Sequence, residues 1–439
     1  MSMKYSRFNH IVPVPDSYDH AIMNYRTGVV ARLDPFQKKL FDLAMQLPED
    51  NPLILSWKNA GFLTGTDDIQ DIRDDLKEHY RIYEARTDKV FRLTLYVTSA
   101  CNFSCPYCFQ ERRGGSMSRE VQDAVVRFAR SKLSTGQFQK MTVGWFGGEP
   151  LLASGVIERL GSQLMDAAAE YKAVFASKII TNGYLLDQDM VDLLERVNCY
   201  FAKITIDGVG DDHDKTRPLR SGGGTYDAII RNLSGIRTSM RLNIRTNLTA
   251  SNYSSYNELC QVIRGIAQKT GNHIICSPKQ VNDNPASEKR GYAAERISPE
   301  LYKQLLNKAG QTSRPNAYGK KVGCCHITSP NYYTVDERGY VYPHCYDDSM
   351  VASCSYGSIL DYDKTGFEKL DKKHLEFCWR EILPERYPKC MACKLLPVCY
   401  GGCPAKRISG AKEPECPPQL TDPDAYVLRR YYEMRKSSV

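Results

Sequence analysis

Six short apolar segments alternate with helical patterns between residues 89 and 285, and this alternation constrains the fold more than any other feature. The strand candidates span residues 91–98, 140–145, 178–181, 203–206, 242–248 and 273–276. In one intervening segment Val121, Val125 and Phe128 recur at helical spacing. Strands that alternate with helices favour βαβ units and a parallel sheet. The sequence therefore predicts an α/β fold, with too few units to close an eight-stranded barrel.

The size and composition are those of a globular protein. The 439 residues are 42% apolar and 25% charged, and the length suffices for two to four domains. No apolar run approaches the roughly 20 residues that cross a bilayer. The first residues also lack the apolar core of a signal peptide. We therefore expect a cytoplasmic protein with no membrane partner.

The cysteine content favours metal or redox chemistry. Eight of the sixteen cysteines lie between Cys345 and Cys416, and reducing cytosol disfavours disulfides. The net charge of +8 is modest for this length, and no basic stripe is interleaved with aromatic residues. Nucleic-acid binding is therefore not expected. A mildly positive surface would equally suit an acidic peptide.

The regions on either side of the βα segment differ from it in composition. Residues 1–88 contain no cysteine and predict a small α+β domain, with a hairpin that turns near Thr27 and helices over 35–46 and 67–82. This domain either braces the next one or docks a peptide. Residues 286–323 form a polar linking region that contains a helical pattern near 299–308. Residues 324–439 are rich in cysteine and end in a basic amphipathic helix, most simply a solvated cap.

Three cysteines, Cys101, Cys105 and Cys108, directly follow the strand candidate at 91–98. Thiolates are the usual ligands of iron–sulfur clusters, and three of them leave one iron of a four-iron cluster open. An open iron can bind and reduce a small molecule, whereas a fully ligated cluster only passes electrons. The alternative is half of a zinc site, because closely spaced cysteines also bind zinc.

The spacing of these cysteines, with an aromatic residue before the last, resembles the cluster loop of radical S-adenosylmethionine (SAM) enzymes. The resemblance implies that SAM chelates the fourth iron of a [4Fe–4S] cluster and that the fold is a partial (β/α)6 barrel. Chemistry would then gather at the carboxyl ends of the strands. One electron would split SAM into methionine and a 5′-deoxyadenosyl radical, which abstracts hydrogen from an unactivated C–H bond.

Motifs after the later strand candidates extend the resemblance to the SAM site. Gly147, Gly148 and Glu149 match the family motif that holds the SAM amino group. Glycines let a ligand approach the backbone, and a carboxylate accepts hydrogen bonds from an ammonium group. The resemblance further implies contacts of the Thr205 hydroxyl with the ribose, of Arg217 with the ribose or carboxylate, and of the Tyr107 backbone with adenine. Asp207 is either a turn cap or a substrate contact, and Asn247 is a further candidate.

The C-terminal cysteines resemble the SPASM extension of peptide-modifying radical SAM enzymes, which holds two auxiliary [4Fe–4S] clusters. The resemblance implies a distal cluster bound by Cys390, Cys393, Cys399 and Cys416. It implies a nearer cluster bound by Cys325, Cys345 and Cys403, whose fourth position is Cys324, Cys354 or open. The gap of five residues between Gly339 and Cys345 departs from the usual four. A pair of structural zinc sites is the alternative.

Two functions compete. The first is a maturase that installs a thioether or carbon–carbon cross-link in a ribosomally made precursor peptide, and the second is a sulfatase-maturing enzyme that forms formylglycine. The second group has an aspartate directly after the cysteine equivalent to Cys345, whereas this chain has Tyr346 there, followed by Asp347 and Asp348. Residues 1–88 have the size of a leader-peptide-binding domain. We therefore favour the peptide maturase, supplied with electrons by reduced flavodoxin or ferredoxin. A non-catalytic iron–sulfur or zinc protein is the remaining alternative.

Overall fold

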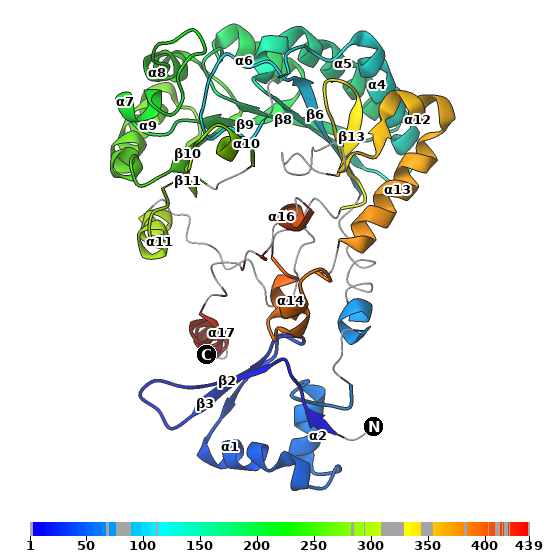
Figure 1. Ribbon diagram of the computed structural model, residues 1–439, viewed down its shortest axis with the longest axis vertical. Coiled ribbons are helices and arrows are strands. Elements are labelled where there is room, and N and C mark those ends of the chain that lie inside the picture. The colour runs from blue at the N-terminus through cyan, green and yellow to red at the C-terminus, as the bar shows by residue number, and fades with distance from the viewer. Residues whose placement is uncertain are drawn as a thin grey trace. The chain divides into compact units, whose positions relative to one another are not determined.

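The computed structural model divides the chain into two compact units, and each is described by itself (Figure 1). The larger comprises Arg86–Arg314 and Ser329–Cys378, and the smaller comprises Met1–Ala85, Pro315–Thr328 and Trp379–Val439. The sequence did not indicate that the N-terminal region and the C-terminal cysteines share a unit. The structure describes residues 3–66, 70–75, 89–110, 113–281, 285–293, 295–308, 329–343, 354–381, 384–402, 404–408, 413–414, 416, 420 and 422–437.

A nine-stranded sheet forms the centre of the described part of the larger unit. Six strands run parallel, and each pairs with its neighbour in sequence: β6 (Val90–Thr98), β7 (Lys140–Gly147), β8 (Val174–Thr181), β9 (Cys199–Thr205), β10 (Arg241–Leu248) and β11 (Ile274–Gln280). All six predicted strands and the α/β class are confirmed. The β6 edge continues into β12 (Tyr332–Val335), β13 (Tyr340–Tyr342) and β14 (Gly357–Ser358), which were not predicted.

Helices between the parallel strands cover the outer face of this sheet (Figure 1). Ser118 caps the first of them by accepting a hydrogen bond from the Val121 N–H at 3.3 Å. Phe128 of that helix packs on Phe91 of β6, with ring centroids 5.7 Å apart. The connecting helices are α4 (Arg119–Leu133), η2 (Pro150–Ala153), α5 (Ser154–Glu170), α6 (Gln188–Arg196), α7 (Asp211–Asp214), α8 (Tyr226–Gly235), η3 (Tyr253–Ser255) and α9 (Tyr256–Thr270).

Further helices follow the last parallel strand and the added strands. The predicted helix near 299–308 is confirmed as α11. In chain order these elements are α10 (Pro285–Lys289), α11 (Pro299–Lys308), α12 (Ile359–Thr365) and α13 (Phe367–Arg380). Among the described residues, no helix has the length and apolarity needed to cross a membrane.

The N-terminal part of the smaller unit is an antiparallel sheet with helices. Asp34 caps α1 in a capping box, accepting from the Gln37 N–H at 2.8 Å, as the sequence predicted. Helix α2 was missed, and only residues 70–75 of the predicted 67–82 helix are described. The elements are β1 (Lys4–Tyr5), β2 (Asn9–Pro13), β3 (His20–Asn24), β4 (Val30–Leu33), α1 (Pro35–Asp42), η1 (Ala44–Gln46), α2 (Pro52–Asn59) and β5 (Leu63–Thr64).

Both faces of the β2–β3–β4 sheet are covered. Phe41 and Trp57, from α1 and α2, pack with Ile22 on one face. Helix α17 (Pro423–Ser437) covers the other, with Tyr426 and Tyr431 buried among sheet residues. The expectation of a solvated terminal cap is therefore wrong, because the apolar stripe of this helix completes the core. The same core includes residues of the cysteine-bearing helices α14 (Pro388–Ala392) and α15 (Leu396–Cys399); α16 (Pro404–Ile408) follows them.

Candidate functional site

The cysteine loop after β6 is held by backbone contacts from a segment more than one hundred residues later. The Ser104 N–H donates to the Pro218 carbonyl at 2.8 Å, and the Arg220 N–H donates to the Asn102 carbonyl at 2.8 Å. Phe103 and Leu219 form an antiparallel bridge between these two bonds. The chain that follows β9 therefore fixes the loop that carries the three predicted ligands.

The three thiols on this loop act on one another electrostatically. Cys105 is buried, and Cys101 and Cys108 are half-buried. Burial raises the pKa of Cys105 to about 11, the thiols of Cys108 and Cys101 push in the same direction, and Arg217 opposes them. Three neighbouring thiols are the donor set that an iron–sulfur cluster requires. Within the described residues no group of three His, Cys, Asp or Glu side chains is arranged to hold a single metal ion.

The glycines after β7 allow two backbone segments to meet. The Gly148 N–H donates to the Thr98 carbonyl at 2.9 Å, and the Glu149 N–H donates to the Ala100 carbonyl at 2.8 Å. A Cβ added at Gly147 would lie 2.1 Å from the Thr98 oxygen, and one at Gly148 would lie 2.2 Å from the Ala100 oxygen. The close approach that we ascribed to a ligand is therefore made, in this structure, by the start of the cysteine loop.

The Glu149 carboxylate is fully buried and accepts three hydrogen bonds from the protein. One oxygen accepts from the Leu151 N–H at 3.1 Å and the Thr181 hydroxyl at 2.7 Å, and the other accepts from the Asn182 N–H at 2.7 Å. Burial raises the pKa of this carboxyl, and these bonds oppose the rise. The side chain thus ties the carboxyl ends of β7 and β8 together.

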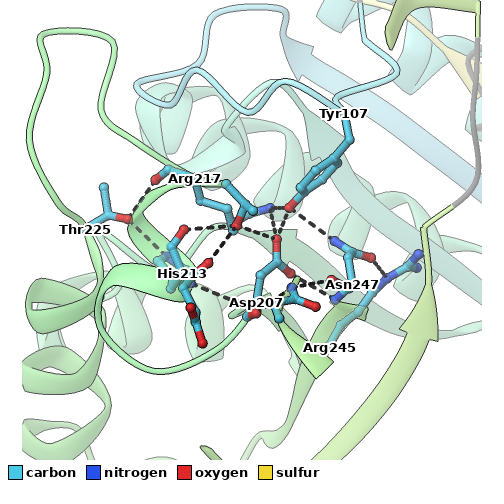
Figure 2. A network of polar contacts seen from close by, with 10 residues as sticks. Tyr107, Asp207, His213, Arg217, Thr225, Arg245 and Asn247 are labelled. Atoms are coloured by element: carbon cyan, nitrogen blue, oxygen red, sulfur yellow. Dashed lines mark hydrogen bonds and ion pairs between the residues drawn. The ribbon is translucent and has the colours of Figure 1, made fainter. Parts of the chain in front are cut away.

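A polar network joins the cysteine loop to β9 and β10, as Figure 2 shows. Its centre is the Tyr107 hydroxyl, which donates to the Asp207 carboxylate and accepts from Arg217 Nη1 at 2.6 Å. Asn247 Nδ2 also donates to this hydroxyl at 3.3 Å. Burial raises the pKa of Asp207, while Arg217 opposes the rise. Sequence reasoning gave Tyr107 only a backbone role and missed its hydroxyl, because no local pattern shows that residues 107 and 207 meet.

His213 extends this network as a neutral relay (Figure 2). The Asp207 N–H donates to His213 Nδ1 at 3.0 Å, so the ring proton lies on Nε2 and is donated to Thr225 Oγ1, also at 3.0 Å. The Thr225 hydroxyl donates to the Arg217 carbonyl at 2.8 Å. Burial, helped by Arg217, lowers the pKa of His213 well below its usual value. These hydrogen bonds position Arg217 and thereby the segment at Pro218 and Arg220 that holds the cysteine loop.

Two predicted SAM contacts, Arg217 and Thr205, lie beside this network, and Arg217 has a polar group available to a ligand. Arg217 is buried, and its Nε has no hydrogen-bond partner among the described residues. Its guanidinium lies 5.6 Å from the Phe103 ring centroid. Thr205 is buried at the end of β9. A buried, unsatisfied donor is costly unless a ligand uses it, so Arg217 fits the ribose or carboxylate of SAM.

The predicted distal-cluster cysteines lie in the smaller unit, where most pairs of their thiols act on one another electrostatically. Cys390 is buried, Cys393 and Cys399 are half-buried, and Cys416 is exposed. Burial raises the pKa of Cys399 to about 11, with Cys393 and Cys390 adding to the effect. Burial likewise raises the pKa of Cys390, helped by Cys416 and Cys393.

The predicted ligands of the nearer cluster lie mostly outside the described residues, namely Cys324, Cys325, Cys345 and Cys403. Cys354 is described and half-buried, in the larger unit.

Arg407 organises the turn after Cys399, and sequence reasoning missed it. This arginine is 2% exposed, and its guanidinium donates to the carbonyls of Tyr400, Gly401 and Gly402 at 3.1, 3.4 and 3.4 Å. It also donates to the carbonyl of Glu381. Backbone carbonyls in this region of short helices therefore accept hydrogen bonds from the Arg407 side chain instead of from backbone N–H groups.

Comparisons with known proteins agree with this geometry. Residues 95–257 match the model of the radical SAM superfamily. Fe-coproporphyrin III synthase of Methanosarcina barkeri is 25% identical over 190 residues, 42% of this chain and 45% of that protein. A cysteine-type anaerobic sulfatase-maturating enzyme of Clostridium novyi is 24% identical over 224 residues, 48% of this chain and 56% of that protein. The chain thus spans about half the length of these two relatives.

Solved structures share the fold. Native anSMEcpe with bound AdoMet has a TM-score of 0.53 at 17% identity, covering 80% of this chain and 97% of that one. Streptococcus suis SuiB bound to precursor peptide SuiA has a TM-score of 0.50 at 15% identity, covering 94% of this chain and 98% of that one. These structures share the fold alone, and the family match shows that residues 95–257 of this chain form a radical SAM domain.

Proposed function

We propose that this enzyme oxidatively modifies a ribosomally made peptide, forming a thioether or carbon–carbon cross-link. The observation that carries the proposal is the cysteine loop, which the protein holds next to the buried, partly unsatisfied Arg217. Cys101, Cys105 and Cys108 would hold a [4Fe–4S] cluster with one iron left for SAM. When bound, the cluster and SAM supply one-electron chemistry that removes hydrogen from an unactivated C–H bond.

The protein's own part is to orient SAM and to exclude water. Arg217 would donate from its buried Nε to the ribose or carboxylate, and the Thr205 hydroxyl would meet the ribose. The Tyr107 backbone would lie against adenine, and the hydroxyl of the same residue keeps the cysteine loop in register with Asp207 and Asn247. A network that is formed before SAM binds lowers the cost of ordering the site.

Auxiliary [4Fe–4S] clusters would complete the enzyme. The distal one would use the four thiols that act on one another in the smaller unit: Cys390, Cys393, Cys399 and Cys416. The nearer one would use Cys325, Cys345 and Cys403, with Cys324, Cys354 or an open position as the fourth. Reduced flavodoxin or ferredoxin would supply the electrons.

The share of this chain that structural similarity covers supports a peptide substrate. The likeness to SuiB, whose title names a bound precursor peptide, covers 94% of this chain, whereas that to anSMEcpe covers 80%. In the described residues of the smaller unit, β2 and β4 pair only with β3, so each has an edge to which an extended leader peptide could add a strand. We therefore propose leader binding for residues 1–88.

Sulfatase maturation is the second candidate, favoured by the Clostridium novyi relative and by anSMEcpe. Asp347 and Asp348 are the aspartates nearest to the position at which sulfatase-maturing enzymes have one. Both lie outside the described residues.

Co-expression with a short open reading frame, sought among the genes beside this one, distinguishes the two candidates. Under anaerobic, SAM-replete conditions we expect the peptide mass to fall by about 2 Da per cross-link, because two hydrogens leave. The matched control replaces Cys101, Cys105 and Cys108 with Ala and should leave the peptide unchanged. Conversion of a sulfatase-derived cysteine peptide to an aldehyde, with the neighbouring peptide unmodified, would overturn the maturase proposal.

A further inference from the structure

Four cysteines remain outside the predicted cluster ligands: Cys199, Cys260, Cys276 and Cys378. Cys199 and Cys378 are buried, so the protein shields their thiols from molecules in solution. Cys260 and Cys276 are each half-buried, and their thiols are hydrogen-bonded to one another. Two neighbouring thiols outside the predicted clusters can be oxidised together to a disulfide.

The strand register places Cys276 of β11 on the helix-covered face of the sheet. Cys276 pairs with Ile244 of β10, and Ile244 pairs with Ile204 of β9; both isoleucines are fully buried. Paired residues of neighbouring parallel strands point to the same side. Asn247, three residues after Ile244, points to the opposite side and reaches the Tyr107 hydroxyl. Cys276 therefore faces the helices and not the candidate SAM site.

Helix α9 brings Cys260 to the same layer. Cys260 lies one turn after Tyr256 and one turn before Ile263, and both of these residues are 1% exposed. Cys260 and Cys276 pack against one core cluster, which contains Tyr256 and Leu248. A disulfide requires sulfur atoms about 2 Å apart, and the hydrogen bond already holds these two in contact.

The two thiols differ in reactivity. The hydrogen bond from Cys276 lowers the pKa of Cys260; the Tyr256 hydroxyl and Arg264 act in the same direction, and burial opposes them. The same hydrogen bond raises the pKa of Cys276, and burial adds to the rise. The thiolate is the nucleophile in thiol–disulfide exchange. Cys260 is therefore the first of the pair to attack, and Cys276 is placed to complete the exchange.

We infer that Cys260 and Cys276 are a modification site, at which a low-molecular-weight disulfide converts the two thiols into a disulfide bridge. The Cys260 thiolate attacks one sulfur of the small disulfide and releases one thiol, and Cys276 then displaces the second. The protein loses two electrons and two protons, and the small disulfide is reduced to two thiols. The bridge joins α9 to β11, which pairs only with β10 in the described sheet, so it fastens an edge strand. This inference is independent of the peptide-modifying function.

Anaerobic treatment of the reconstituted holoenzyme with glutathione disulfide tests the inference, with the cluster ligands occupied. Trypsin cleaves after Arg264 and Lys269, so the two cysteines fall in different peptides. Without reducing agent we expect a linked pair of these peptides, about 2 Da lighter than their sum because two hydrogens are lost. Dithiothreitol should separate them. The wild-type measurement needs no substitution, so a variant that fails to fold leaves the test intact.

Two serine variants test the order of the steps. Cys276→Ser should trap Cys260 as a mixed disulfide with glutathione, whereas Cys260→Ser should leave Cys276 as a thiol. The matched control is Cys199→Ser, which removes a buried cysteine and should form the bridge as the wild type does.

Four outcomes would each overturn the inference. These are no linked peptide from the wild type, a bridge from Cys260 or Cys276 to another cysteine, loss of the bridge in the Cys199→Ser control, and glutathione on Cys276 rather than on Cys260 in the two serine variants.

Discussion

The two groups of cysteines are held in different ways. The cysteine loop of the larger unit is fixed by partners distant in sequence: Pro218 and Arg220 through the backbone, and Asp207 through the Tyr107 hydroxyl. The cysteine array of the smaller unit comprises Cys390, Cys393, Cys399 and Cys416, and two of these, Cys390 and Cys399, lie on the short helices α14 and α15. There the Cys393 N–H donates to the Cys390 carbonyl at 3.1 Å, a local turn.

This difference indicates which site depends on its metal. Long-range contacts fix the cysteine loop as part of the barrel, so it should keep its shape without a cluster. The array rests more on contacts close in sequence, namely local turns and the Arg407 donors to Tyr400, Gly401 and Gly402, beside the core packing of Leu396 and Val398. We therefore expect cluster binding to stabilise the array more than the loop. Four experiments test this contrast, beginning with the largest expected effect.

Replacing Gly148 with Ala should disrupt the loop most. Its Cβ would lie 2.2 Å from the Ala100 carbonyl oxygen, and backbone cannot move as a flexible side chain can. We expect a loss of about 3 kcal/mol in unfolding free energy of the cluster-free protein, measured by urea denaturation. The control is Gly155→Ala, where nothing lies within 4 Å of the added Cβ. Equal stability of the two variants would contradict the close approach.

Replacing Arg407 with Gln should affect the array and spare the loop. Four carbonyls would lose a charged donor in a buried position, at a cost of about 2 kcal/mol. Iron bound by the reconstituted protein should fall, while SAM cleavage should continue. Arg32→Gln, which breaks the exposed ion pair with Asp19, should leave the stability and the iron content close to those of the wild type. Loss of SAM cleavage with full iron content would show that Arg407 supports the cysteine loop and not the array.

Replacing Thr225 with Val tests the His213 relay at nearly constant volume. The variant removes the acceptor of the His213 proton and the donor to the Arg217 carbonyl, so the Arg217 segment should be less well positioned. We expect about tenfold weaker SAM binding, measured by equilibrium dialysis, and about 1 kcal/mol lower stability. Thr225→Ser keeps the hydroxyl and should restore both. If the Thr225→Ser variant bound SAM as weakly as the Thr225→Val variant, packing at residue 225 and not the hydroxyl hydrogen bonds would be responsible.

The fourth experiment concerns pH and a buried histidine of α13, His374. His374 is buried between the Tyr356 hydroxyl and the Ser329 carbonyl, each at 2.9 Å, and burial lowers its pKa to about 3. In the unfolded chain its pKa is about 6.5. Between these values, falling pH protonates only the unfolded state, so stability should decline by about 1.4 kcal/mol per pH unit.

The variant His374→Gln should therefore lose less stability than the wild type between pH 7.5 and 5.5. Denaturant midpoints at the two pH values provide the measurement. Some decline should remain, because burial also keeps His213 neutral. Parallel pH profiles for the variant and the wild type would contradict the assigned cause.

Much of the larger unit followed from local patterns. Each of the six predicted strands exists, because apolar segments between helical patterns have few alternatives to a buried parallel sheet. One strand runs longer than predicted where polar residues follow the apolar segment, as at Lys279 of β11. The smaller unit was less predictable: α17 was taken for a solvated cap, and its core joins residues such as Phe8 and Tyr431 from opposite ends of the chain.

The sequence by itself determined the chemistry available: three thiols after one strand, a glycine–glutamate turn after the next, and a second set of thiols near the end of the chain. Spacing along the chain carries that information, because ligand type and turn conformation are local properties. Only the tertiary structure decided which groups meet, such as Tyr107 with Asp207 and His213 with Thr225. Such contacts depend on register and burial, which arise from packing across the whole fold rather than from neighbouring residues.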